Sequence, residues 1–192
     1  MALTDTSVGW VFAVAVFALG AAIGSFLNVV IYRLPAGLSL VRPASRCPRC
    51  ERPLPWHENV PILGWLRIMG RCRGCSTRVS IRYPAVELLT AVLSLWIWVH
   101  VSHGNLDLNP DYFGDSLLAC GMAFFFYFYF VAILISITFI DIDHTIIPHE
   151  LTFTGLALGL AAAFLMPTGG SMHDLWPAIG WLDALLGILV GG

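Results

Sequence analysis

The chain has 192 residues, of which 58% are hydrophobic and only 11% are charged. Soluble domains carry about 25% charged residues, so this composition excludes an ordinary soluble globule and a disordered chain and indicates a protein embedded in lipid. All ten basic residues are arginines, and all lie within 33–82, where the only acids are Glu51 and Glu58. No basic tail of the kind that binds nucleic acid is present, so we predict no nucleic-acid partner.

Five segments are apolar enough to form membrane-spanning helices, which need roughly 20 residues to cross a hydrocarbon core of about 30 Å. The first segment has neither the basic start nor the small-residue cleavage site of a signal peptide, so it is predicted to be a permanent helix. We therefore predict an all-α polytopic membrane protein with about five transmembrane helices. In chain order the segments are 8–31, 84–101, 117–140, 151–166 and one that begins near 178.

The arginines predict how these helices are oriented, because short arginine-rich loops stay in the cytoplasm. The segment 33–83 is therefore predicted to be cytoplasmic and the N-terminus to be outside. The loop 102–116 carries three aspartates and no arginine and is predicted to be outside, whereas the turn 141–150 returns to the cytoplasm. The arginines either only set this topology or also hold the cytoplasmic loop against anionic headgroups.

Two CxxC pairs lie in the cytoplasmic loop, with 21 residues between them. Two such turns at this distance are typical of a structural zinc site with four thiolate ligands, which leaves no open position for catalysis. Disulfides are disfavoured in the cytoplasm, and an iron–sulfur cluster is the minor alternative. We predict a zinc knuckle that binds Zn²⁺ through Cys47, Cys50, Cys72 and Cys75. The fifth cysteine, Cys120, is predicted to be a buried core thiol.

Asp141 and Asp143 stand where the third predicted span meets the cytoplasm. Ionisable residues at this depth are costly and mark candidate functional sites. Asp141 directly follows an apolar run, so we expect it to be the more buried carboxyl and the better candidate for a general acid. Residues two apart on a helix point to different faces, so the two are not expected to share one proton. Alternatively, both acids only end the span. A further alternative is a second metal site formed by His144, His149 and Glu150.

Polar residues inside the predicted spans also need partners. Ser25 and Asn28 lie three apart on one face of the first span, where they either bind a neighbouring helix or line a substrate groove. Glu87 lies just inside the second span, and we expect it to form an ion pair with Arg82 or Arg33.

Four sequence strings, in this order and spacing, resemble the prepilin leader peptidase/N-methyltransferases. They are GSFLNVVIYRLP at 24–35, the segment from Cys47 to Cys75, SIRYPAVELLTA at 80–91 and DIDHTIIPHELT at 141–152. The resemblance covers most of residues 20–155.

The resemblance implies a polytopic aspartic peptidase of the bacterial inner membrane. Such enzymes remove the basic leader of type IV prepilins and pseudopilins at the cytoplasmic face, then methylate the new N-terminus with S-adenosylmethionine. It places the first catalytic aspartate at Asp141, with Asp143 beside it, and the four cysteines at the zinc loop. We predict three regions: 1–32 (first span), 33–83 (zinc loop) and 84–192 (helical peptidase region, incomplete at the C-terminus). The resemblance assigns no residue to S-adenosylmethionine and no oligomeric state.

Two features depart from the family pattern. His149 follows the proline of the aspartate string, where an acid or asparagine is usual. The second catalytic aspartate belongs to a GxGD motif after the fifth span, and this sequence stops before such a motif; Asp183 is a poor substitute. We therefore expect about the N-terminal two-thirds of the enzyme, with little or no peptidase activity by itself. The alternative is a non-catalytic membrane scaffold whose zinc knuckle docks a cytoplasmic partner.

Overall fold

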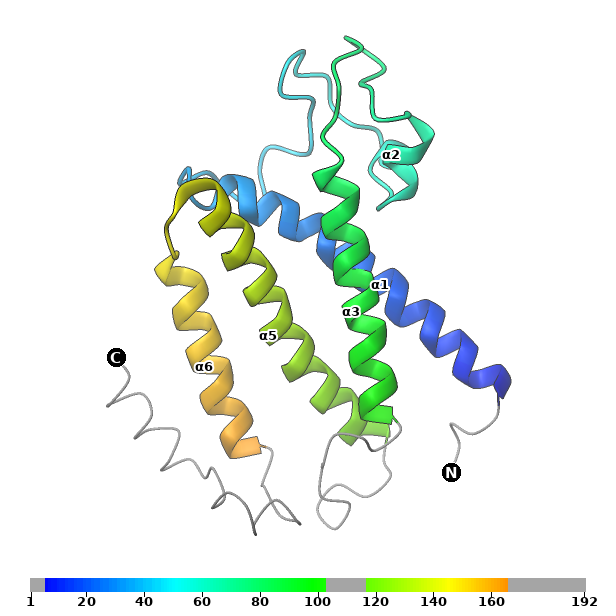
Figure 1. The fold of residues 1–192 in the computed structure, drawn as a ribbon, viewed down its shortest axis with the longest axis vertical. Helices are drawn as coiled ribbons and strands as arrows, with labels where there is room; N and C mark the ends of the chain where they lie inside the picture. The colour runs from blue at the N-terminus through cyan, green and yellow to red at the C-terminus, as the bar shows by residue number, and fades with distance from the viewer. Residues whose placement is uncertain (1–5, 103–116, 166–192) are drawn as a thin grey trace.

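The computed structural model describes residues 6–102 and 117–165, and within these ranges its regular elements are helices (Figure 1). The all-α prediction is confirmed for this part of the chain. The loop between the first two long helices contains only two isolated antiparallel β-bridges and two short helices. The elements are α1 (Thr6–Arg33), the 3₁₀ helix η1 (Trp56–Glu58), α2 (Leu63–Arg67), α3 (Arg82–Ser102), α5 (Leu117–His144) and α6 (His149–Leu165).

Three of these helices are long and apolar enough to cross a membrane, namely the segments Gly9–Arg33, Arg82–Ser102 and Cys120–His144. They match the first three predicted spans. The fourth predicted span corresponds to α6, of which the structure describes 17 residues, up to Leu165, and this described part is not among the candidate spans. The fifth lies outside the described residues. The prediction of five spans is therefore corrected to three candidate spans within the described chain.

Helices α1 and α3 pack closely because α1 has glycines at the contact. A Cβ at Gly24 would lie 2.7 Å from the Cα of Glu87, and one at Gly20 would lie 2.8 Å from the Cα of Ala91. Small residues spaced in this way let two backbones approach in a membrane, where apolar burial alone does not drive helix association. The Ser94 hydroxyl also donates to the Val16 carbonyl at 3.1 Å and ties the two helices together.

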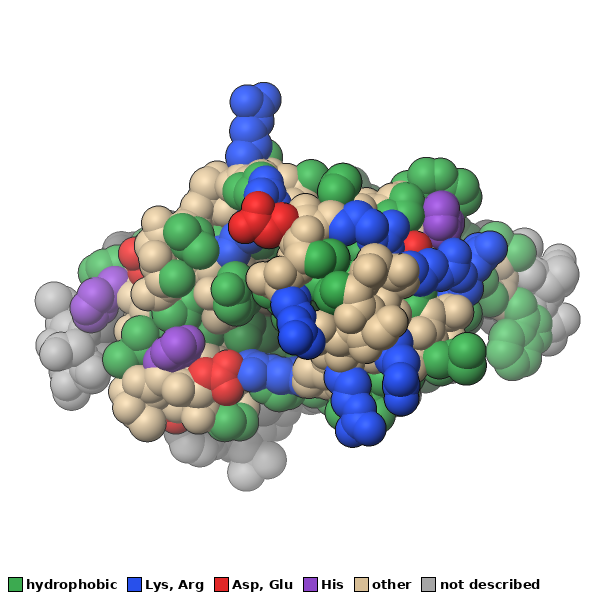
Figure 2. Space-filling model, turned by 90° about the horizontal axis from the view of Figure 1, so that it is seen from above, with side chains coloured by type: hydrophobic (Ala, Val, Ile, Leu, Met, Phe, Trp, Pro, Cys, Tyr) green, Lys and Arg blue, Asp and Glu red, His purple; other side chains and the backbone are tan. Residues whose placement is uncertain are grey.

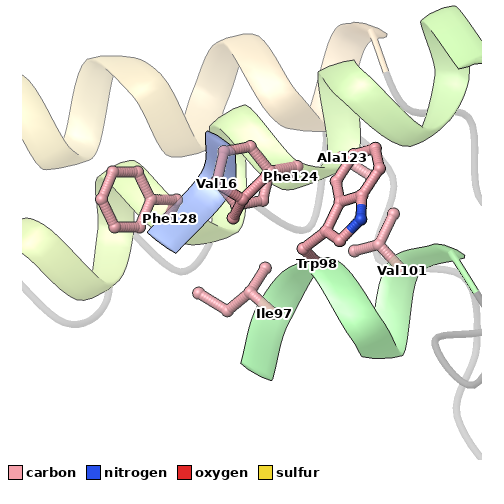
Figure 3. Close-up of a cluster of buried hydrophobic side chains, with 7 residues drawn as sticks. All are labelled: Val16, Ile97, Trp98, Val101, Ala123, Phe124 and Phe128. Carbon is pink, nitrogen blue, oxygen red and sulfur yellow. The ribbon is translucent and has the colours of Figure 1, made fainter. Parts of the chain in front are cut away.

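Aromatic side chains join α3 to α5. The Trp98 ring lies edge-on to Phe124, with centroids 5.9 Å apart, and Phe124 stacks on Phe128 at 5.3 Å. Phe124 and Phe128 are four apart and therefore share one face of α5, whereas Phe125 points outward. Figure 3 shows this cluster, whose buried members are Val16, Ile97, Trp98, Val101, Ala123, Phe124 and Phe128.

A second apolar cluster lies nearer the arginine-rich loop and includes Leu27, Val86 and Ile140 from α1, α3 and α5. The end of α1, the start of α3 and the turn between α5 and α6 all lie at this end of the bundle (Figure 1). The loop 34–81 and the Asp141 region are therefore on the same side of the molecule, which agrees with the predicted alternation of the spans.

Candidate functional site

The four cysteines of the loop come together as the sequence predicts. Their Sγ atoms all lie within 4.8 Å of one another, with Cys47 3.8 Å from Cys75 and Cys50 3.9 Å from Cys72. A Zn–S bond of about 2.3 Å in a tetrahedron gives sulfur–sulfur distances of about 3.8 Å. The donor set and its spacing therefore fit a zinc ion, and four thiolates would close its coordination and make the site structural.

Each CxxC pair sits on a turn of the same design. The backbone N–H of Cys47 donates to the Arg52 carbonyl at 3.0 Å, and that of Glu51 donates back to the Cys47 carbonyl at 2.9 Å; the turn 72–77 repeats both bonds at 2.9 and 2.8 Å. The residue after each second cysteine has a left-handed backbone, with φ of 55° at Glu51 and 57° at Ser76. These two turns aim both sulfurs of each pair at one point.

The turns also set the ionisation of the thiols. Backbone N–H groups of Cys75 and Gly74 lower the pKa of Cys72 to about 6, and hydrogen bonds from Thr77 lower the pKa of Cys75. The Arg52 backbone has the largest single effect on Cys50 and lowers its pKa, but burial and the other three thiols together raise that pKa to about 11. Thiolates bind metals and thiols do not. The lowered pKa values of Cys72 and Cys75 therefore favour the ionised form that binds a cation.

Glu58 joins the two cysteine turns. Its carboxylate is almost fully buried and pairs with Arg52 after the first CxxC, and with Arg73 inside the second CxxC at 3.7 Å. A buried carboxylate needs such partners to offset its desolvation. The sequence offered Glu58 as one of two acids among the arginines and as a group that could attract a cationic substrate leader, but not as the residue that joins the two cysteine turns.

The loop is attached to the membrane helices through Glu87 of α3 and Arg33 of α1. Glu87, buried in α3, accepts the backbone N–H of Ile62 at 2.6 Å. Asn28 of α1 donates to the Tyr83 carbonyl at 3.0 Å, which confirms that it binds a neighbouring helix. The expected ion pair of Glu87 with an arginine is wrong, because Arg82 pairs with Asp143 and the Arg33 guanidinium donates to loop carbonyls.

Asp141 and Asp143 lie in the last turn of α5, and both are exposed. The expectation that Asp141 is the more buried carboxyl is wrong, because the packed face of α5 ends at Ile140, which is fully buried. Asp143 pairs with Arg82 at 2.5 Å. The same guanidinium donates to the Phe139 carbonyl at 3.2 Å. Arg82 thus ties the first residue of α3 to the end of α5, a contact that the sequence did not reveal.

A second metal site at the α5–α6 turn is not supported within the described residues. His144, His149 and Glu150 are exposed there, and among the described residues the four cysteines are the cluster with metal-ligand geometry. Thr145 ends α5 in a left-handed conformation, with φ of 51°, and its N–H bonds the Asp141 carbonyl at 2.8 Å. The side chains of the turn are exposed except that of Pro148, which is buried.

Comparison with known proteins matches most of the chain to one family. Residues 18–101 match the model of the bacterial peptidase A24 N-terminal domain, and residues 128–192 match the model of the type IV leader peptidase family. No solved structure shows a significant match.

The similar curated proteins carry one kind of name. A prepilin leader peptidase/N-methyltransferase of Myxococcus xanthus is 42% identical over 95% of this chain and 47% of its own length. One from Aeromonas salmonicida is 35% identical over 94% of this chain and 63% of its own length. A type 4 prepilin-like proteins leader peptide-processing enzyme of Escherichia coli is 33% identical over 90% of this chain and 61% of its own length.

The chain thus spans between about half and two thirds of the length of these relatives. The two matched family models and the four-cysteine loop agree with the resemblance that the sequence strings indicated. The chain belongs to the peptidase A24, or type IV leader peptidase, family and includes its bacterial N-terminal domain.

Proposed function

We propose that this protein cleaves the leader peptide from type IV prepilins or pseudopilins and N-methylates the new terminus. The observation that carries the proposal is the place of Asp141, an exposed carboxylate in the last turn of a helix long enough to span a membrane. A substrate whose own helix lies in the membrane would present its scissile bond at this level. The names of the relatives support the same pair of activities.

Asp141 is proposed as the catalytic carboxylate. Peptide hydrolysis by an aspartic peptidase needs one carboxylate to take a proton from water and another to protonate the substrate. Asp141 has no partner carboxylate in the described part of the chain that could share this task, since Asp143 is held by Arg82. We propose that Asp143, which the sequence also offers as catalytic, positions the end of α5.

The zinc loop is proposed to have a structural role. Cys47, Cys50, Cys72 and Cys75 would hold Zn²⁺ and fix the fold of a loop that has few regular elements. S-adenosylmethionine would supply the methyl group when bound. The regions 1–32, 33–83 and 84–192 are proposed as first span, zinc loop and peptidase region.

We propose an inner-membrane location with the N-terminus outside. Because the arginine-rich loop and Asp141 lie at the same end of the bundle, both would lie on the same side of the membrane. Arginine in short loops favours the cytoplasmic side, which would place the cleavage site where the basic leader of a substrate lies.

A prepilin cleavage assay on the native-length protein tests the proposal. Asp141→Asn is expected to lower kcat by about 10²–10⁴-fold, the usual contribution of a general acid or base, with unchanged zinc content. Glu150→Gln, which removes a nearby exposed acid, is the matched control and should leave cleavage intact. Full cleavage by Asp141→Asn would reject the assignment. A wild-type protein that binds zinc but cleaves no prepilin would favour the scaffold alternative.

A further inference from the structure

Exposed apolar side chains lie on α2, just after it at Met69, and at Ile81 directly before α3. Leu63 is 64% exposed, Leu66 56%, Met69 83% and Ile81 70%. Exposed apolar surface of this kind, bordered by charged residues, marks a contact with a membrane or another protein. This exposed apolar surface therefore indicates a contact with a membrane or another protein.

The depth of α2 relative to the membrane-spanning helices favours the bilayer as this partner. Ile62, directly before α2, donates its N–H to Glu87 at 2.6 Å, and Glu87 lies five residues inside α3, or about 7.5 Å along its axis. Figure 1 shows α2 beside the upper end of α3 and below the top of the loop. Interfacial helices lie about 5–10 Å into the headgroup and acyl boundary. With Arg82, the first residue of α3, taken as the edge of the bilayer, this depth puts the start of α2 in the interfacial layer.

A groove next to α2 combines apolar walls with two cationic groups. Its volume is about 390 Å³, and its lining includes Trp65, Met69, Arg71, Arg78 and Ile81. The Trp65 indole donates to the Val79 carbonyl at 3.1 Å, which fixes the aromatic wall. Arg71 and Arg78 are bridge partners on opposite strands of the turn, so their side chains leave on the same face.

The charge of this region matches an anionic surface. From residue 59 to residue 86 the chain has five arginines and no acid. Arg73 and Arg82 have carboxylate partners, whereas Arg67, Arg71 and Arg78 have no ion pair among the described residues. Seen from above, arginine side chains project from much of this face (Figure 2). Each arginine near an anionic membrane contributes about fivefold in binding.

We propose that α2 lies in the cytoplasmic interface of the bilayer and that the Trp65–Arg71–Arg78 groove binds the headgroup of an anionic phospholipid. Leu63, Leu66 and Met69 would enter the acyl boundary, and the two arginines would bind the phosphate. The zinc loop is then fixed to the membrane surface through its side as well as through its two ends.

Photo-crosslinking in lipid nanodiscs tests the depth of α2. In the native-length protein, Leu66→benzoylphenylalanine is expected to give several-fold more lipid adducts than Ser76→benzoylphenylalanine, an exposed position in the second cysteine turn. Equal lipid adducts at the two positions would overturn the proposal.

Matched charge variants test the groove. By native mass spectrometry of protein from nanodiscs with mixed phosphatidylcholine and phosphatidylglycerol, Arg71→Gln with Arg78→Gln should weaken phosphatidylglycerol retention about 25-fold, or fivefold per arginine. Arg42→Gln with Arg46→Gln removes the same charge from exposed positions outside the groove and should change retention far less. Equal losses of phosphatidylglycerol retention in the two double variants would show that only net charge matters and would reject a specific headgroup site. Displacement of phosphatidylglycerol by S-adenosylmethionine would assign the groove to a soluble ligand and also reject it.

Discussion

At the scale of single residues, Glu58 is the acid on which the geometry of the zinc loop depends most. Glu58→Gln removes the charge that faces Arg52 and Arg73, one from each cysteine turn. Groups that orient metal ligands indirectly change metal affinity by about 10–100-fold, and we expect about tenfold faster zinc release to a chelator. Glu51→Gln, an exposed acid beside Cys50, is the matched control. Equal release rates for the two variants would contradict this role.

The lowered pKa of Cys72 predicts how zinc binding depends on pH. The pKa falls from its ordinary value of 9.0 to about 6 in the folded protein, so the thiolate is present above about pH 6 and is lost as the pH falls through that value. Because zinc binding displaces the thiol protons, the apparent zinc affinity should fall as the pH is lowered from 8 to 5, as measured by competition with a colorimetric chelator. An apparent affinity that does not change between pH 8 and pH 5 would contradict thiolate ligation of the metal.

At the scale of elements, the approach of α1 to α3 depends on residues without side chains. Gly24→Ala would place a methyl group 2.7 Å from the Cα of Glu87, which must separate the helices and cost about 1–3 kcal/mol. Gly121→Ala in α5 meets nothing within 4 Å and should be neutral or stabilising, because alanine favours helices over glycine. Thermal unfolding in detergent compares the two variants, and equal melting temperatures would refute tight packing at Gly24.

At the scale of the whole molecule, the membrane helices and the zinc loop have different sources of stability. The helices are held by apolar and glycine packing, whereas the loop depends on four sulfurs and a few hydrogen bonds. Removal of zinc, or Cys47→Ser with Cys72→Ser, should make residues 34–81 sensitive to protease while the far-UV circular dichroism changes little. Zinc added back after chelation should restore resistance. Loss of helical signal in parallel with the loop would show that the two parts unfold together.

The same division explains which features were readable from the sequence. The first three spans followed from runs of apolar residues, because a membrane helix needs a fixed length. Four cysteines in two CxxC pairs predicted a common site, because the spacing within each pair is local. The exposure of Asp141 was not readable, because it depends on where the packing of α5 against other helices ends.

The sequence by itself determined that this protein is helical, enters the membrane and carries a four-cysteine site, since hydropathy, charge and short spacings are properties of local chain segments. Only the tertiary structure decided that Glu58 joins the cysteine turns, that Arg82 holds Asp143, and that Glu87 binds Ile62 rather than an arginine. Each of these contacts pairs groups from different segments, and several arginines compete for each acid. The choice among them is made by distance and burial in the folded chain, which residue order does not encode directly.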